Sequence, residues 1–159
     1  MNARALVAAL PAHHRRQSGP QGTAQPFLRP SHAPRELVFD APATRACARA
    51  ARRCAASVLV SWGLPVEARE TAELIIAELT ANAALHGGCE MTMRLTLIEV
   101  ELEIDVSDRG VSDAEAIPES CGDEHGRGLT IVSALADWVH TECSPEGRRV
   151  LVGLSTGVV

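Results

Sequence analysis

A helix is predicted where apolar residues recur every four positions, between residues 40 and 62. The acid and the early proline at 40–42 favour a helix start, and Gly63 favours its end. The recurring residues are Ala46, Ala50, Cys54, Val58 and Trp62. The run from Arg35 to Phe39, just before this helix, predicts a strand.

Two more helices are predicted by apolar residues at helical spacing. The second begins at Leu64-Pro65 and continues to Leu85 or His86, where two glycines end it. The third begins at 126–128 and places five apolar residues on a helical repeat. These residues are Leu129, Ile131, Val132, Leu135 and Ala136.

Four later segments favour strands. Apolar and polar residues alternate in 91–97 and again in 100–106, which predicts an antiparallel hairpin that turns near Ile98-Glu99. Two last strands are expected at 138–143 and 148–154. This order of elements predicts a two-layer α/β (α+β) sandwich, in which three helices cover one face of a mostly antiparallel, mixed sheet and leave the other face wet.

The chain divides into a tail and one domain. Residues 1–34 are rich in Pro, Gly, Gln, His and Arg, so too little apolar surface is available to offset the entropy of ordering them. We therefore predict a disordered tail over 1–34 and a single folded domain over 35–159. Nothing in the sequence indicates a role for the tail.

Composition and charge exclude several function classes. All 15 basic residues are Arg, so a P-loop or a protein-kinase fold, each of which needs a Lys on the phosphates, is excluded. The chain after residue 35 contains ten arginines and twenty acidic residues, and such an acidic domain is not expected to bind nucleic acid. No apolar run is long enough to span a membrane, and the short apolar run after Ala5 lacks signal-peptide features, which predicts a cytoplasmic protein. The five scattered cysteines predict neither a disulfide framework nor a zinc site, and most are expected to be buried thiols.

Polar side chains are predicted along the buried edge of the second helix. Glu78, Asn82 and His86 lie four residues apart, on or beside the face formed by its apolar residues. An unpartnered buried Glu or Asn is costly, so their spacing suggests a shared ligand. An Asn oxygen can coordinate Mg²⁺, and a Glu one turn away can orient a water or hydroxyl.

Two glycine motifs follow. Asp108-Arg109-Gly110 places a carboxylate at the end of an apolar strand, where it could hold an adenine amino group. Gly126-Arg127-Gly128 stands at a helix start, where free N–H groups attract a phosphate and Arg127 adds charge. Each motif alone also fits ordinary structure: a solvated helix edge, a backbone turn or a flexible helix start.

Taken together, the motifs resemble the GHKL (histidine-kinase-like) ATPase family. Its N-box is matched by residues 78–87, its Asp-Gly box by 108–110, and its last Gly box by 126–132, in the family's order. The resemblance covers about residues 36–155. The compact size and the Leu-His-Gly ending of the first motif look most like the anti-sigma-factor serine/threonine kinases of bacteria.

The resemblance implies a set of roles. Glu78 would be the general base, and Asn82 would hold Mg²⁺ on the phosphates of ATP. Asp108 would bind adenine, with Gly110 shaping that pocket, and Gly126 and Gly128 would lie against the phosphates. The remaining nucleotide-binding residues would be His86, Arg127 and Leu129, and residues 111–125 would form the ATP lid. The implied partners are a sigma factor and an anti-anti-sigma (antagonist) protein, with a homodimer as the usual assembly.

The sequence also departs from the family pattern. Ser112 replaces the second glycine of the Asp-Gly box, and residues 111–125 carry five acids and no Arg. An acidic lid covers phosphates poorly. Two functions therefore stay open: an ATP-dependent serine/threonine kinase, and a non-catalytic regulator that binds ATP and a protein. A detached histidine-kinase catalytic domain and an interaction domain without nucleotide are further alternatives.

Overall fold

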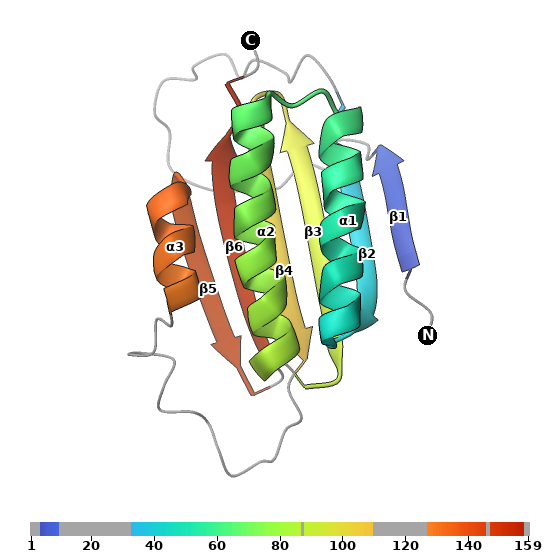
Figure 1. Cartoon of the computed structure of the whole chain (residues 1–159), viewed down its shortest axis with the longest axis vertical. Helices are drawn as coiled ribbons and strands as arrows, with labels where there is room; N and C mark the ends of the chain where they lie inside the picture. The colour runs from blue at the N-terminus through green and yellow to red at the C-terminus, as the bar shows by residue number, and fades with distance from the viewer. Residues whose placement is uncertain (1–3, 10–32, 87, 110–126, 146, 158–159) are drawn as a thin grey trace, which may run out of the picture.

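The computed structural model describes residues 4–9, 33–86, 88–109, 127–145 and 147–157. Within them, six strands form one sheet in the order β1-β2-β3-β4-β6-β5 (Figure 1). The strands are β1 (Arg4–Ala9), β2 (Arg35–Pro42), β3 (Glu90–Ile98), β4 (Glu101–Arg109), β5 (Trp138–Ser144) and β6 (Gly147–Ser155). The helices are α1 (Arg45–Ser61), α2 (Val66–His86) and α3 (Arg127–Leu135).

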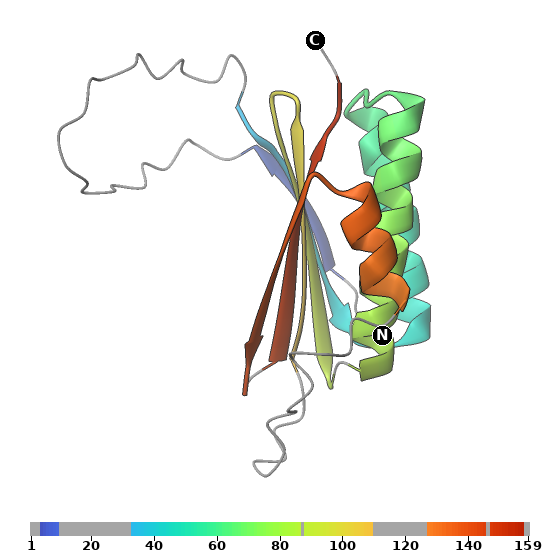
Figure 2. The same ribbon diagram turned by 90° about the vertical axis from the view of Figure 1, so that its left-hand side faces the viewer.

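The three helices all lie on one face of the sheet, as the side view shows (Figure 2). This arrangement confirms the two-layer α/β sandwich predicted from the order of the elements. One detail differs: every pair of neighbouring strands is antiparallel, so the sheet is not mixed. Hairpins account for two of these pairs, β3 with β4 and β5 with β6, because a hairpin always makes its strands antiparallel.

The core lies between the helices and the sheet. Alternate residues of β3 and β4 are buried beneath the helices, as the period-two pattern predicts. The buried row of α1 is built mostly from small residues: Cys47, Ala48, Ala51, Ala55 and Leu59. It lies one position later than the row Ala46–Trp62 that the sequence indicated, whose members are exposed or only half-buried. The shift follows from the 3.6-residue period, because two adjacent four-residue rows compete for one face.

The start of α1 differs from the prediction. Residues 40–42 continue β2 and pair with β3, so Asp40 is not the helix cap. Thr44 takes that role, because its side-chain oxygen accepts a hydrogen bond from the backbone N–H of Cys47 at 3.2 Å. Gly63 follows the helix with φ +77°, a conformation that glycine adopts without steric cost, which agrees with its predicted role as a stop.

The prediction of a disordered tail over 1–34 is wrong for residues 4–9. These residues form β1, which pairs with β2 at the edge of the sheet. The prediction rested on the average composition of the whole tail, which its short apolar run does not share. Without β1, β2 would be an edge strand with unpaired backbone groups, and residues 4–9 pair with them. The remainder of the tail up to residue 32 lies outside the described residues.

The face of the sheet without helices carries ion pairs. Arg149 on β6 binds the carboxylate of Asp105 on β4 at 2.7 Å, and Arg94 on β3 binds Glu36 on β2 at 3.2 Å. This face is therefore the wet one that the alternating pattern predicts. Among the described residues, no helix is both long enough and apolar enough to cross a membrane.

Candidate functional site

Four elements meet at one end of the sandwich, the lower end in Figure 1. They are the last turns of α2, the end of β4, the start of α3 and the start of β6. A cavity of about 20 Å³ lies between them, which is room for about one water molecule. Its lining residues are Leu79, Asn82, Ala83, Val106, Asp108, Leu129, Arg148 and Val150. Three of the predicted site residues, Asn82, Asp108 and Leu129, are thus brought together.

Glu78 and Asn82 lie against the start of α3. A Cβ added to Gly128 would be 2.8 Å from Oε2 of Glu78 and 3.2 Å from Nδ2 of Asn82. Both side chains are half-buried, one turn apart on α2. Gly128 therefore allows a close approach of α3 to these two polar groups. The sequence placed Gly128 beside a phosphate but did not indicate its contact with Glu78 and Asn82.

Asp108 and Arg148 are direct neighbours across β4 and β6. The backbone N–H of Arg148 donates to Oδ1 of Asp108 at 3.4 Å. Two positions further inside on each strand stand Val106 and Val150, which are buried beneath the helices. Because side chains alternate along a strand, Asp108 and Arg148 continue these apolar rows and face the helix layer. They form the polar end of the core.

Arg148 was not among the residues predicted for the site. Its Nε atom is buried and meets no hydrogen-bond acceptor among the described residues. A buried donor without a partner costs roughly 1–3 kcal/mol, so such an atom indicates a position suited to a ligand. The period-two pattern of residues 148–154 contained the signal, because it places Arg148 on the same face as the buried Val150, Val152 and Leu154.

Gly147 supports the same end of the site. It has φ +149°, and an added Cβ would overlap the backbone carbonyl oxygen of Asp108. Only glycine therefore fits where β6 begins beside the end of β4. In the sequence this residue indicated only a turn between the last two strands.

For the remaining predicted site residues, the structure describes only some of the positions. Arg127 opens α3 and is exposed, and the first turn of this helix carries no acid that would repel a phosphate. His86 ends α2, but its side chain is not described. Gly110, Gly126, Ser112 and the predicted lid over 111–125 lie outside the described residues.

The donor groups suit a magnesium nucleotide rather than a metal held by protein alone. Mg²⁺ prefers oxygen ligands and commonly takes one or two from protein and the rest from phosphates and water. Glu78 and Asn82 supply a carboxylate and an amide oxygen side by side. No group of three or more His, Cys, Asp or Glu suited to a metal occurs within the described part of the chain.

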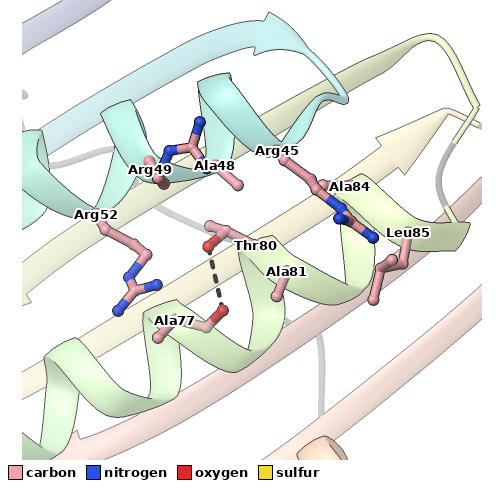
Figure 3. A pocket seen from close by; sticks show the side chains of 9 residues that line it. All are labelled: Arg45, Ala48, Arg49, Arg52, Ala77, Thr80, Ala81, Ala84 and Leu85. Carbon is pink, nitrogen blue, oxygen red and sulfur yellow. Dashed lines mark hydrogen bonds between the residues drawn. The ribbon is translucent and has the colours of Figure 1, made fainter.

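A larger hollow of about 320 Å³ lies elsewhere, between α1 and α2 (Figure 3). Its floor is made of alanines and Thr80, Leu85 lies at one end, and its rim carries Arg45, Arg49 and Arg52 from α1. None of the residues assigned to the nucleotide lines it. We assign the chemistry to the smaller cavity, because the polar groups converge there. We refer to the larger hollow as the arginine groove.

None of the described cysteines lines either cavity. Cys47 is buried, Cys54 half-buried and Cys89 exposed, and all three are free thiols. Burial raises the pKa of the Cys54 thiol. Cys143 is disulfide-bonded. Cys47 is the one buried thiol among the described cysteines, so the expectation of mostly buried thiols is wrong for this part of the chain.

Comparison with known protein families identifies the domain. The model of the histidine kinase-like ATPase domain matches residues 41–153, well over half of the 159-residue chain. A search among curated proteins finds none that matches. The family match spans Glu78, Asn82, Asp108 and Gly128, which the fold brings to one end of the sandwich. The chain therefore belongs to the histidine kinase-like ATPase family, a family of ATP-binding domains.

Proposed function

We propose that this protein is a cytoplasmic ATP-binding regulator of the anti-sigma-factor type, which phosphorylates a serine or threonine of an antagonist protein. The observation that carries the proposal is the position of Glu78 and Asn82 beside Gly128, where α3 begins. A helix start attracts phosphate, so the reacting end of ATP would lie there, with adenine toward Asp108.

Each residue then has a defined task. The carboxylate of Glu78 accepts the proton of the attacking hydroxyl, and the amide oxygen of Asn82 binds the metal. Mg²⁺ supplies positive charge that offsets the charge on the transferred phosphoryl group. Backbone N–H groups at the start of α3, with Arg127, bind the phosphates in a chain that has no lysine.

The arginine groove favours the binding of a protein partner. Arg45, Arg49 and Arg52 follow one another along α1, and none of them has an ion pair within the described residues. Leu85, at the end of the groove, is 57% exposed. Arginine is enriched in protein interfaces, and positive patches there meet negative ones, so acidic side chains of a sigma factor or an antagonist would dock there.

A non-catalytic regulator is the second candidate. It is favoured by Ser112 and by the acidic residues of segment 111–125, which are a poor cover for phosphates. Such a protein would bind ATP and a partner without transferring phosphate. In both cases the bound nucleotide would set the affinity for the partner.

Nucleotide binding is tested by calorimetry with Mg-ATP on the full chain. Wild type should bind, and Asn82→Ala and Asp108→Ala should each weaken binding at least about tenfold, since each removes a polar contact in the site. Glu73→Ala, which is exposed on the same helix as Asn82, is the matched control. Unchanged binding in both site variants would show that the assigned site is wrong.

Phosphoryl transfer is tested with γ-labelled ATP, Mg²⁺ and the cognate antagonist. Loss of label in Glu78→Gln, with Mg-ATP binding retained, would support the kinase. No label with wild type, despite ATP binding, would favour the non-catalytic regulator. Equal labelling by wild type and Glu78→Gln would contradict the role assigned to Glu78.

A further inference from the structure

Arg148 stands where the base of a nucleotide would lie. It is the cross-strand neighbour of Asp108 and lines the same cavity as Asn82 and Leu129. Under the proposed function, the carboxylate of Asp108 accepts a hydrogen bond from the amino group of adenine. A donor and an acceptor therefore stand side by side at the base position.

This pair bears directly on base selectivity. A carboxylate alone discriminates against guanine, because guanine has a carbonyl oxygen where adenine has its amino group, and two acceptors repel. An adjacent guanidinium removes that penalty, since arginine donates readily to the O6 of guanine. Asp108 can then accept from the ring N1–H and the 2-amino group.

We propose that Arg148 extends base recognition in this cavity to guanine, so that the site binds GTP as well as ATP. The proposal rests on the proposed function, because it assumes that the base lies beside Asp108. Arg148 acts here as a residue of base specificity and takes no part in phosphoryl transfer.

The burial of Arg148 is consistent with this role. Its Nε is buried without an acceptor among the described residues, so moving the side chain onto a base breaks no hydrogen bond at that atom. The cavity holds only about 20 Å³, so a purine fits only after a lining side chain turns away. Arg148 is the longest of the lining side chains and is only half-buried, whereas Leu79 and Leu129 are almost fully enclosed.

The test measures the affinities of Mg-ATP and Mg-GTP by calorimetry on the full chain. In wild type, the two dissociation constants should lie within about tenfold of each other. Arg148→Leu should weaken Mg-GTP at least about tenfold and Mg-ATP less than about threefold, since a base contact by arginine contributes to only one of them. Arg148→Gln, which keeps an N–H donor, should retain part of the GTP affinity.

Arg53→Leu is the matched control, because it makes the same change at an exposed position on α1 that does not line the cavity. It should leave both affinities unchanged. If wild type binds Mg-ATP but Mg-GTP more than about a hundredfold more weakly, the proposal is wrong while the proposed function stands. If Arg148→Leu weakens both nucleotides equally, Arg148 does not select the base. If neither nucleotide binds to wild type, both proposals fail together.

Discussion

Gly128 and Glu78 lie so close that a single methyl group would press them apart. The Cβ of an alanine at 128 would be 2.8 Å from Oε2 of Glu78, at a helix start that carries no acidic residue of its own. The start of α3 and the carboxylate assigned as general base therefore share one small space. A substitution at either residue should therefore change the position of the other.

Gly128→Ala tests this relationship. The added Cβ must displace the carboxylate of Glu78 and crowd the amide of Asn82, so we expect affinity for Mg-ATP to fall about tenfold. The fold should be kept, because alanine favours a helix by about 0.5–1 kcal/mol over glycine and offsets the crowding. Calorimetry and a thermal melt measure the two effects.

Ser133→Ala is the control for this change, since Ser133 is exposed on the same helix. It should alter neither affinity nor melting temperature. Full Mg-ATP affinity in Gly128→Ala would mean that the nucleotide does not depend on this contact.

Gly147→Ala should destabilise the fold. Its φ of +149° disfavours any side chain, and a Cβ would overlap the carbonyl oxygen of Asp108. Strain of this kind costs at least about 2 kcal/mol, which corresponds to a fall of about 4–8 °C in Tm for a domain of this size. Thr141→Ala, exposed on β5, should change Tm by less than about 2 °C. An unaltered Tm in Gly147→Ala would show that the start of β6 can shift to accommodate a side chain, and that glycine is not required at this position.

Glu103 makes stability depend on pH. Partial burial raises the pKa of this carboxyl above 4.5, and the neighbouring charges of Asp105 and Glu101 raise it further, against two nearby arginines. A raised pKa in the folded state means that the ionised form destabilises the fold. The penalty is present above the folded pKa and disappears as pH falls through it.

Glu103→Gln should therefore raise the free energy of unfolding at pH 7 by up to about 0.5 kcal/mol. The gain should vanish as pH falls below the ordinary pKa of a glutamate, because the carboxyl is then protonated in the folded and the unfolded state alike. Thermal melts of both proteins across this range measure the difference, with Glu73→Gln on α2 as the control. A gain that grows toward acid pH would contradict the sign of the shift.

Charge reversal in the arginine groove should disturb partner docking alone. Arg49→Glu places an acid on the rim of the groove, where the proposed acidic partner would be repelled. We expect binding of the cognate antagonist or sigma factor to fall at least about tenfold, while the affinity for Mg-ATP is unchanged. Arg53→Glu makes the same charge change at an exposed position outside the groove and is the control. Equal losses in the two variants would point to net charge rather than a docking site.

Most of the fold followed from periodicity. The hairpin of β3 and β4 was predicted within a few residues, because alternation over two runs leaves a single register that buries Met93, Leu95 and Ile104. The cap of α1 was misplaced, since an acid before a proline resembles a helix start equally well inside a strand. Which of Asp40 and Thr44 caps α1 depends on how far β2 continues to pair with β3. That pairing joins segments distant in the sequence, so local pattern does not reveal it.

The candidate site could be predicted in part. Glu78, Asn82 and Asp108 were proposed because polar residues interrupt apolar patterns, and Gly128 because glycines flank a helix start; the fold brings the four to one end of the sandwich. Arg148 was missed because two consecutive arginines beside a turn are both expected to be exposed to solvent. Only the pairing of β4 with β6 shows that the first arginine faces the helices and the second faces Asp105.

That pairing has a consequence for evolution of the site. Because successive residues of a strand alternate between faces, a shift of one position between β4 and β6 would turn Arg148 outward and bring Arg149 to the cavity. The apolar residues of β6 hold this register, so they also fix which of the two arginines lies beside Asp108. Substitutions deep in the sheet that disturb this register would thus displace Arg148 from Asp108 without touching the pocket itself.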